Sequence, residues 1–143
     1  MRFTITKELK NKHLAILFKD IKDINNFSFN KDEISYINNE YKDDNQINII
    51  TIDKLSKVYY ICIVNDKKNF NYLEGWRKVG DQIQAKVCND KQTELGIESY
   101  TKDANIEYAF LEGAILGTYS FDKYLTKKAT KLDHIYLNNN KLT

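Results

Sequence analysis

Apolar and polar residues alternate with two different periods along this chain, and each change of period marks a predicted element. Short runs rich in Ile, Val, Leu and Phe predict strands, because β-branched and aromatic residues suit a pleated, half-buried surface. Apolar residues that recur every three or four positions predict helices with one buried face. Six strands are expected, at 3–6, 14–18, 47–52, 58–64, 93–98 and 132–137.

The first helix is expected to follow Asn30, after a polar connector at 19–30. Asn is a favourable N-cap, and Glu33 at the third helical position completes a capping pattern. Apolar residues at 34, 37 and 41 then follow with helical spacing, and the polar run 42–45 ends the helix.

The second helix has the most regular apolar face in the chain. Its members recur at intervals of three and four residues, which is the helical period. Gly75 and Gly80 each cost about 1 kcal/mol relative to Ala inside a helix. They therefore predict either a close neighbour or a kink. The apolar face consists of Tyr72, Trp76, Val79, Ile83 and Val87.

The third helix is expected to begin at Thr101 as its cap, with Asp103 in the first turn. One broad face carries mostly small residues, which predicts that the helix backbone lies close against a sheet. Leu111 and Ile115 add apolar surface on another side, so the helix is expected to be largely buried. The broad face contains Ile106, Ala109, Phe110, Gly113, Ala114 and Gly117.

The predicted order is β-β-α-β-β-α-β-α-β. Strands that alternate with helices predict an α/β fold, with a mixed or mostly parallel sheet flanked by helices on both faces. The strands at 47–52 and 58–64 could form an antiparallel hairpin or lie apart. No linker or internal repeat interrupts residues 1–143, so a single domain is expected.

Composition adds little to this picture. The 143 residues are 42% hydrophobic with a net charge of +2, which gives no strong field toward nucleic acid or an anionic membrane. Lysines at 123–131, with Tyr119 and Tyr124, could form a nucleic-acid surface, but a solvated loop is the favoured interpretation. No apolar stretch predicts a signal peptide or a membrane span, so a cytoplasmic location is expected.

Residues that could carry chemistry are few and scattered. Cys62 lies in an apolar run and is expected to be a reduced core thiol, and Cys88 stands far from it. His13 and His134 have no metal-ligand partner nearby in the sequence, and no His-Glu-x-x-His, Cys-x-x-Cys or Gly-x-Ser-x-Gly pattern is present. The sequence therefore predicts no catalytic, cofactor-binding or metal-binding residue within this chain.

The segment 111–128 carries a distinctive pattern around the end of the third helix. It resembles the end of the N-terminal domain in the leucyl (cytosol) aminopeptidase family, which has Glu-Gly-Ala-x-Leu-Gly-x-Tyr-x-Phe-Asp-x-Tyr there. Upstream, 47–64 and Trp76–Gly80 resemble the order of strand, strand and helix in that family, so the resemblance covers roughly 46–137. The matching residues are Glu112, Gly113, Ala114, Leu116, Gly117, Tyr119, Phe121, Asp122 and Tyr124.

This resemblance implies a macrodomain-like three-layer fold and a non-catalytic domain of a hydrolase. In the family, two divalent metal ions, usually zinc, and the catalytic residues belong to a C-terminal catalytic domain, whose motifs are absent from 1–143. A metal-bound water is the implied nucleophile of that metalloprotease. The implied partners are the chain's own catalytic domain, the other subunits of a hexamer and, in the whole enzyme, a peptide substrate.

Two other hypotheses remain open. The alternating layout also fits a stand-alone macrodomain-like binding module, although the turn at 65–68 reads Asn-Asp-Lys-Lys and lacks the glycines of an ADP-ribose pocket. A small independent enzyme is the third hypothesis, and it ranks last because no site signature is present. The leading hypothesis is a structural or regulatory domain of a metal-dependent aminopeptidase.

Overall fold

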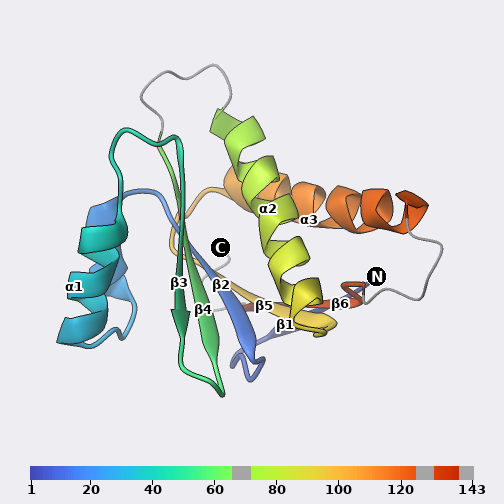
Figure 1. The fold of residues 1–143 in the computed structure, drawn as a ribbon, viewed down its shortest axis with the longest axis horizontal. Coiled ribbons are helices and arrows are strands. Elements are labelled where there is room, and N and C mark those ends of the chain that lie inside the picture. The colour runs from blue at the N-terminus through green and yellow to red at the C-terminus, as the bar shows by residue number, and fades with distance from the viewer. Residues whose placement is uncertain (66–71, 125–130, 139–143) are drawn as a thin grey trace.

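A computed structural model shows ten elements in the predicted order, with one short helix added (Figure 1). It describes residues 1–65, 72–124 and 131–138, and the side chains of 119–124 lie outside the description. The elements are β1 (Arg2–Thr6), β2 (His13–Phe18), η1 (Ile21–Asn26), α1 (Lys31–Glu40), β3 (Ile47–Asp53), β4 (Val58–Val64), α2 (Tyr72–Asn89), β5 (Glu94–Ser99), α3 (Ala104–Tyr124) and β6 (His134–Asn138).

The strands form one mixed sheet in the order β1-β6-β5-β2-β4-β3. All neighbouring strands run parallel except β3, which pairs antiparallel with β4 and places Ile50 opposite Ile61. The strands at 47–52 and 58–64 therefore form the hairpin that the sequence left open. The predicted α/β fold with a mixed sheet and helices on both faces is confirmed.

The sheet separates two apolar clusters, and β2 contributes to both. Ala15 and Leu17 face the larger cluster under α2 and α3, whereas Ile16 and Phe18 face the smaller cluster under α1. All six residues of β2 are buried, as its continuous apolar run predicts. Figure 1 shows the resulting three layers, with α1 on one side of the sheet and the α2–α3 pair on the other.

The first helix begins as predicted, with a complete capping box. The Glu33 amide donates to the Asn30 side chain at 2.8 Å, and the Asn30 amide donates to the Glu33 carboxylate at 2.9 Å. The backbone of Asn30 holds the pKa of Glu33 below its usual range, and Lys54 at 3.1 Å adds to this effect. The cap also ties α1 to the β3–β4 turn.

The N-cap of the third helix lies two residues after Thr101, the cap that the sequence predicts. The Asn105 amide donates to the Asp103 side chain at 3.0 Å, and the Glu107 amide donates to the Asp103 carbonyl. Asp103 therefore caps α3. The Thr101 hydroxyl instead forms a hydrogen bond with the Ser99 hydroxyl at 2.9 Å, because Thr101 still belongs to the turn that follows β5.

The small-residue face of α3 packs against α2, which corrects the expectation that it lies flat on the sheet. A β-carbon added to Gly113 would overlap the backbone of Arg77, and one added to Gly80 would overlap the backbone of Phe110. The two helices therefore cross with backbone on backbone. Larger residues of α3, such as Ile106 and Phe110, reach the core beneath. This close neighbour also accounts for Gly80.

One element was not predicted. Residues 21–26 form the 3-10 helix η1, with the Lys22 amide donating to Asp20 at 3.2 Å. Its residue Ile24 is buried in the smaller cluster, and Phe27 and Phe29 pack against Tyr59 just beyond it. The polar connector is thus part of the layer on the α1 side.

Candidate functional site

The neighbouring strands β2 and β5 mark the point where the chain changes direction across the sheet. The connection after β2 leads to α1 on one face, and the connection after β5 leads to α3 on the other. Ligands of open α/β sheets bind outside the carboxyl ends of the strands at such a point. The residues that follow Phe18 and Ser99 are therefore the first place to look for a site.

The polar groups at this point bond mostly to one another. The Tyr100 amide donates to the Leu17 carbonyl at 2.8 Å, and the Tyr100 hydroxyl donates to Glu98 at 2.7 Å. Burial raises the pKa of Tyr100, and the bond to Glu98 adds to the rise. The amide of Asn138 on β6 also donates to Glu98, at 2.8 Å. These bonds fasten the ends of three strands to each other.

Glu107, in the first turn of α3, is the carboxyl group at this end with a raised pKa. Burial is the largest cause, the Asp103 carboxylate adds to the rise, and a hydrogen bond with Ser99 opposes it. A carboxyl group with a raised pKa is suited to proton transfer. However, the hydroxyls of Ser99 and Thr101 bond to each other and to the turn before α3, so the arrangement anchors the helix.

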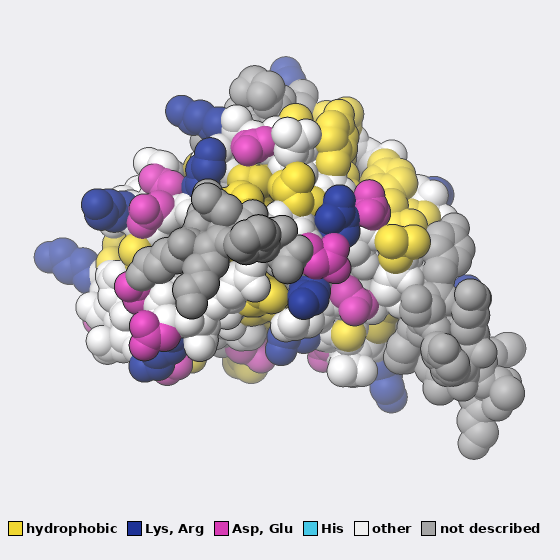
Figure 2. Space-filling model, turned by 90° about the horizontal axis from the view of Figure 1, so that it is seen from above, with side chains coloured by type: hydrophobic (Ala, Val, Ile, Leu, Met, Phe, Trp, Pro, Cys, Tyr) yellow, Lys and Arg dark blue, Asp and Glu magenta, His cyan; other side chains and the backbone are white. Residues whose placement is uncertain are grey.

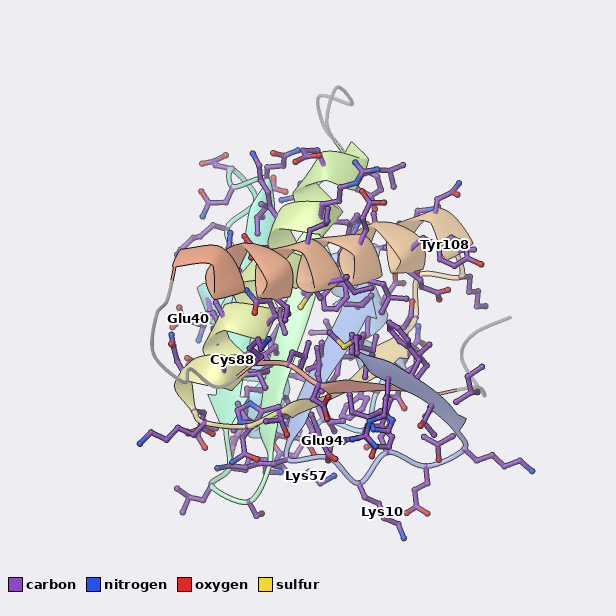
Figure 3. The ribbon with its side chains drawn as sticks, turned by 90° about the vertical axis from the view of Figure 1, so that its right-hand side faces the viewer. Lys10, Glu40, Lys57, Cys88, Glu94 and Tyr108 are labelled. Carbon is purple, nitrogen blue, oxygen red and sulfur yellow. The ribbon has the colours of Figure 1, made fainter. Side chains whose placement is uncertain are left out.

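A second polar region lies at the opposite end of the sheet, between β1, β6 and the loop after β1. It is a cavity of about 480 Å³, and Figure 3 shows Lys10 and Glu94 at this end. Glu94 accepts bonds from Asn11 at 3.4 Å and from Tyr136 at 3.3 Å. Both signs of charge line this cavity, so it does not select one class of ligand. Its lining residues are Thr4, Thr6, Lys7, Glu8, Lys10, Asn11, Glu94 and Tyr136.

His13 bridges two polar side chains that sequence reasoning did not connect with it. Its Nδ1 lies 2.8 Å from the Tyr60 hydroxyl, and its Nε2 lies 2.7 Å from Asp90, which also pairs with Lys12 at 3.2 Å. Burial, followed by the Asp90 charge, raises the pKa of Tyr60 to about 12. The hydroxyl is thus held in its neutral form, and the three side chains fasten β2 to β4 and to the end of α2.

In the part of the chain that the structure describes, no three or more His, Cys, Asp or Glu side chains lie together where they could hold a metal ion. Cys62 and Cys88 are both free and buried, and burial raises the pKa of each thiol. The predicted reduced core thiol at Cys62 is confirmed.

The fold is similar to part of a solved aminopeptidase. The chain matches a mutant of tomato leucine aminopeptidase with a TM-score of 0.61 and 10% sequence identity, over 96% of this chain and 32% of that one. The likeness is one of fold. The chain spans about a third of the length of that protein. No protein-family model matches the sequence, and no curated protein sequence matches it.

The residues of the aminopeptidase-like pattern fall into three groups. Gly113 and Ala114 are buried, and Gly117 meets the side chains of Asp81 and Gln84 on α2. Glu112 is on the surface and pairs with Arg77 of α2 at 2.9 Å, whereas Leu116 is 55% exposed. The other four side chains lie outside the description, although their backbone continues α3. They are Tyr119, Phe121, Asp122 and Tyr124.

The outer side of α3 carries apolar residues among mixed charges. Tyr108 is 68% exposed, and Figure 3 shows it at the outer end of the helix. On the face seen in Figure 2, Lys and Arg side chains are interspersed with Asp and Glu. The predicted basic loop begins with Lys123 in α3, and residues 125–130 lie outside the described residues. None of the helices in the described ranges is long and apolar enough to cross a membrane.

Proposed function

We propose that this chain is the N-terminal structural or regulatory domain of a metal-dependent leucyl aminopeptidase. The proposal is carried by the fold likeness to a leucine aminopeptidase over 96% of the chain, together with the Glu112–Tyr124 pattern that resembles the same family. Peptide hydrolysis, two divalent metal ions, hexamer formation and a cytoplasmic location come with the proposal. Catalysis and metal binding are assigned to a catalytic domain outside these 143 residues.

The role of α3 in this proposal is to present a contact surface to that catalytic domain. Gly113 on its inner side packs against α2, and Phe110 packs in the core. Its outer side is therefore the side that can contact another domain. The exposed apolar residues Tyr108 and Leu116 lie there. Burial of such apolar surface against another domain is favourable in proportion to its area.

The decisive experiment combines sequencing of the reading frame past residue 143 with assays of leucine-amide hydrolysis. The longer product, loaded with zinc or manganese, is expected to hydrolyse the amide, and the 143-residue chain with the same metal is expected to be inactive. An in-frame stop with no catalytic domain encoded nearby would count against the proposal, as would hydrolysis by the short chain. Micromolar affinity for ADP-ribose in calorimetry would favour the binding-module hypothesis instead.

The contact surface can be tested separately in the whole enzyme. Replacing the exposed residues Tyr108 and Leu116 with Ala is expected to leave the Tm of the isolated domain nearly unchanged while lowering the activity or stability of the full enzyme. Phe110→Ala is the matched control on the same helix. Phe110 is fully buried, so its truncation is expected to cost the isolated domain about 3–5 kcal/mol. A large loss of Tm in this double variant would show that those side chains stabilise the domain itself and would count against a contact surface there.

A further inference from the structure

The sheet ends at β1, and the structure describes no strand on the outer side of it. Figure 1 shows β1 and β6 at the foot of the sheet, on the side away from α1. We propose that β1 pairs antiparallel with β1 of a second copy of this chain, so that two sheets join into one across a two-fold axis. This inference does not depend on the proposed aminopeptidase function.

The direction of the backbone groups in β1 identifies which residues are available for pairing. The Arg2 amide donates to the Asp133 carbonyl at 2.8 Å, so Arg2 faces β6. Successive residues of a strand turn their amides and carbonyls to opposite edges. Thr4 and Thr6 therefore face β6 as well, whereas Phe3 and Ile5 direct their backbone groups outward.

The same two residues carry the exposed apolar side chains of the strand. Phe3 is 48% exposed and Ile5 is 65% exposed. They stand in register with Ile135 and Leu137 of β6, which belong to or pack against the larger cluster. Phe3 and Ile5 thus extend the apolar face of the sheet from β6 onto the edge strand β1. Soluble proteins usually protect such an edge with charge, Pro or a bulge.

A two-fold axis at Thr4 pairs the outward backbone groups of Phe3 and Ile5 and also covers their exposed side chains. It places Phe3 opposite Ile5 of the second copy, and Ile5 opposite Phe3, in hydrogen-bonded pairs that each exchange two N–H···O bonds. The paired apolar side chains lie on the same face and become cross-strand neighbours. In this register every residue of Arg2–Thr6 stands opposite a residue of the same strand in the second copy.

The side-chain pattern of β1 is self-complementary, and charge within the strand does not oppose pairing with a second copy. In this register Arg2 stands opposite Thr6, so no two like charges meet within the strand. Arg2 is already paired with Asp133 at 2.9 Å, and the chain contains no Pro that would blunt the edge. Because the strand complements itself, each copy offers the other the same outward amides and carbonyls and the same apolar side chains. A five-residue edge is a small interface, so a weak, concentration-dependent dimer is expected.

Sedimentation equilibrium of the 143-residue chain tests the proposal. The average mass is expected to rise toward twice the monomer mass between about 1 µM and 1 mM, the range typical of small interfaces. Ile5→Pro removes an outward amide without touching the pairing with β6, and it is expected to raise the dimer Kd at least ~10-fold. Ile5→Lys is the second variant if circular dichroism shows that the proline variant is unfolded. Leu116→Lys changes exposed apolar surface on α3 and is expected to leave the dimer unchanged.

A cross-linking experiment tests the register. Thr4 would face its own copy in a non-hydrogen-bonded pair, where Cα atoms lie about 4.5 Å apart, within disulfide range. Thr4→Cys is therefore expected to give a covalent dimer with oxidised glutathione, whereas Thr6→Cys, placed opposite Arg2, is not. The native Cys62 and Cys88 are buried and do not compete. A chain that stays monomeric at all concentrations, or a dimer that Leu116→Lys abolishes and Ile5→Pro and Ile5→Lys do not, would overturn the proposal.

Discussion

Replacing Gly113 with Ala tests whether α2 and α3 meet backbone on backbone. A β-carbon at this position would lie 2.8 Å from the Cα of Arg77 and closer still to its carbonyl, where real β-carbons keep beyond 3.0 Å. The obstacle is the backbone of α2, which no rotamer change can move. The helices must therefore separate, and the core side chains beneath them must lose contacts.

The expected loss follows from two opposing effects. Overpacking of a core costs about 1–3 kcal/mol and occasionally more, and a backbone clash belongs at the upper end. Ala gains about 1 kcal/mol over Gly as a helix former. The net decrease in the free energy of unfolding is then about 2 kcal/mol or more, and a domain of this size is expected to lose roughly 6 °C in Tm.

Gly117→Ala, one turn later on α3, is the matched control. Its β-carbon would first meet the Asp81 carboxylate, an exposed side chain that can rotate away, and the amide of the buried Gln84 would lie at 2.9 Å. The gain in helix propensity then offsets the loss of their hydrogen bond, so stability is expected to change by less than about 1 kcal/mol. Urea unfolding of both variants measures the difference. If Gly113→Ala were as stable as the unsubstituted chain, the close crossing of the helices would be refuted.

Three further predictions concern charge and burial. Glu107→Gln should raise the free energy of unfolding at pH 7 but not at pH 4, because the raised pKa of Glu107 makes its ionised form unfavourable in the folded state. Asp90→Asn should lower the free energy of unfolding at pH 7: hydrogen bonds from His13 and Lys12 lower the pKa of Asp90, so its contribution is present above about pH 4 and lost as the pH falls below it. Denaturant unfolding at pH 7 and pH 4 checks the sign for Glu107→Gln, and a comparison of pH 7 with about pH 2 checks the sign for Asp90→Asn. Trp76 is fully buried and its indole N–H has no partner among the described residues, so Trp76→Phe should cost under about 1.5 kcal/mol and Trp76→Ala about 3–5 kcal/mol, as thermal unfolding would show.

The elements with a strong local period could be predicted from sequence, because that period arises from burial on one face. The face from Tyr72 to Val87 became α2, and the continuous apolar run at 14–18 became the strand buried on both sides. The short helix at 21–26 was missed because six residues give too few repeats of any period. The start of α3 was misplaced since Thr101 and Asp103 are both acceptable caps.

Long-range contacts could not be predicted from a single sequence. His13, Tyr60 and Asp90 meet only because the order of strands brings β2, β4 and the end of α2 together. The glycines of α3 indicated a close neighbour, but composition does not say whether a sheet or a helix fills the space. The Glu112–Tyr124 pattern pointed to a family whose solved member has a similar fold, and the assignment of function beyond fold stays a prediction.

The two apolar clusters on either side of the sheet differ in size, and this difference has a consequence for local opening. The layer containing α1 rests on the smaller cluster, and Ile37 is the one buried residue of that ten-residue helix. Local opening of such a thin layer requires less free energy than complete unfolding. The layer containing α1 should therefore unfold first under mild denaturing conditions. Its amide protons should then exchange with deuterium well before those of α2.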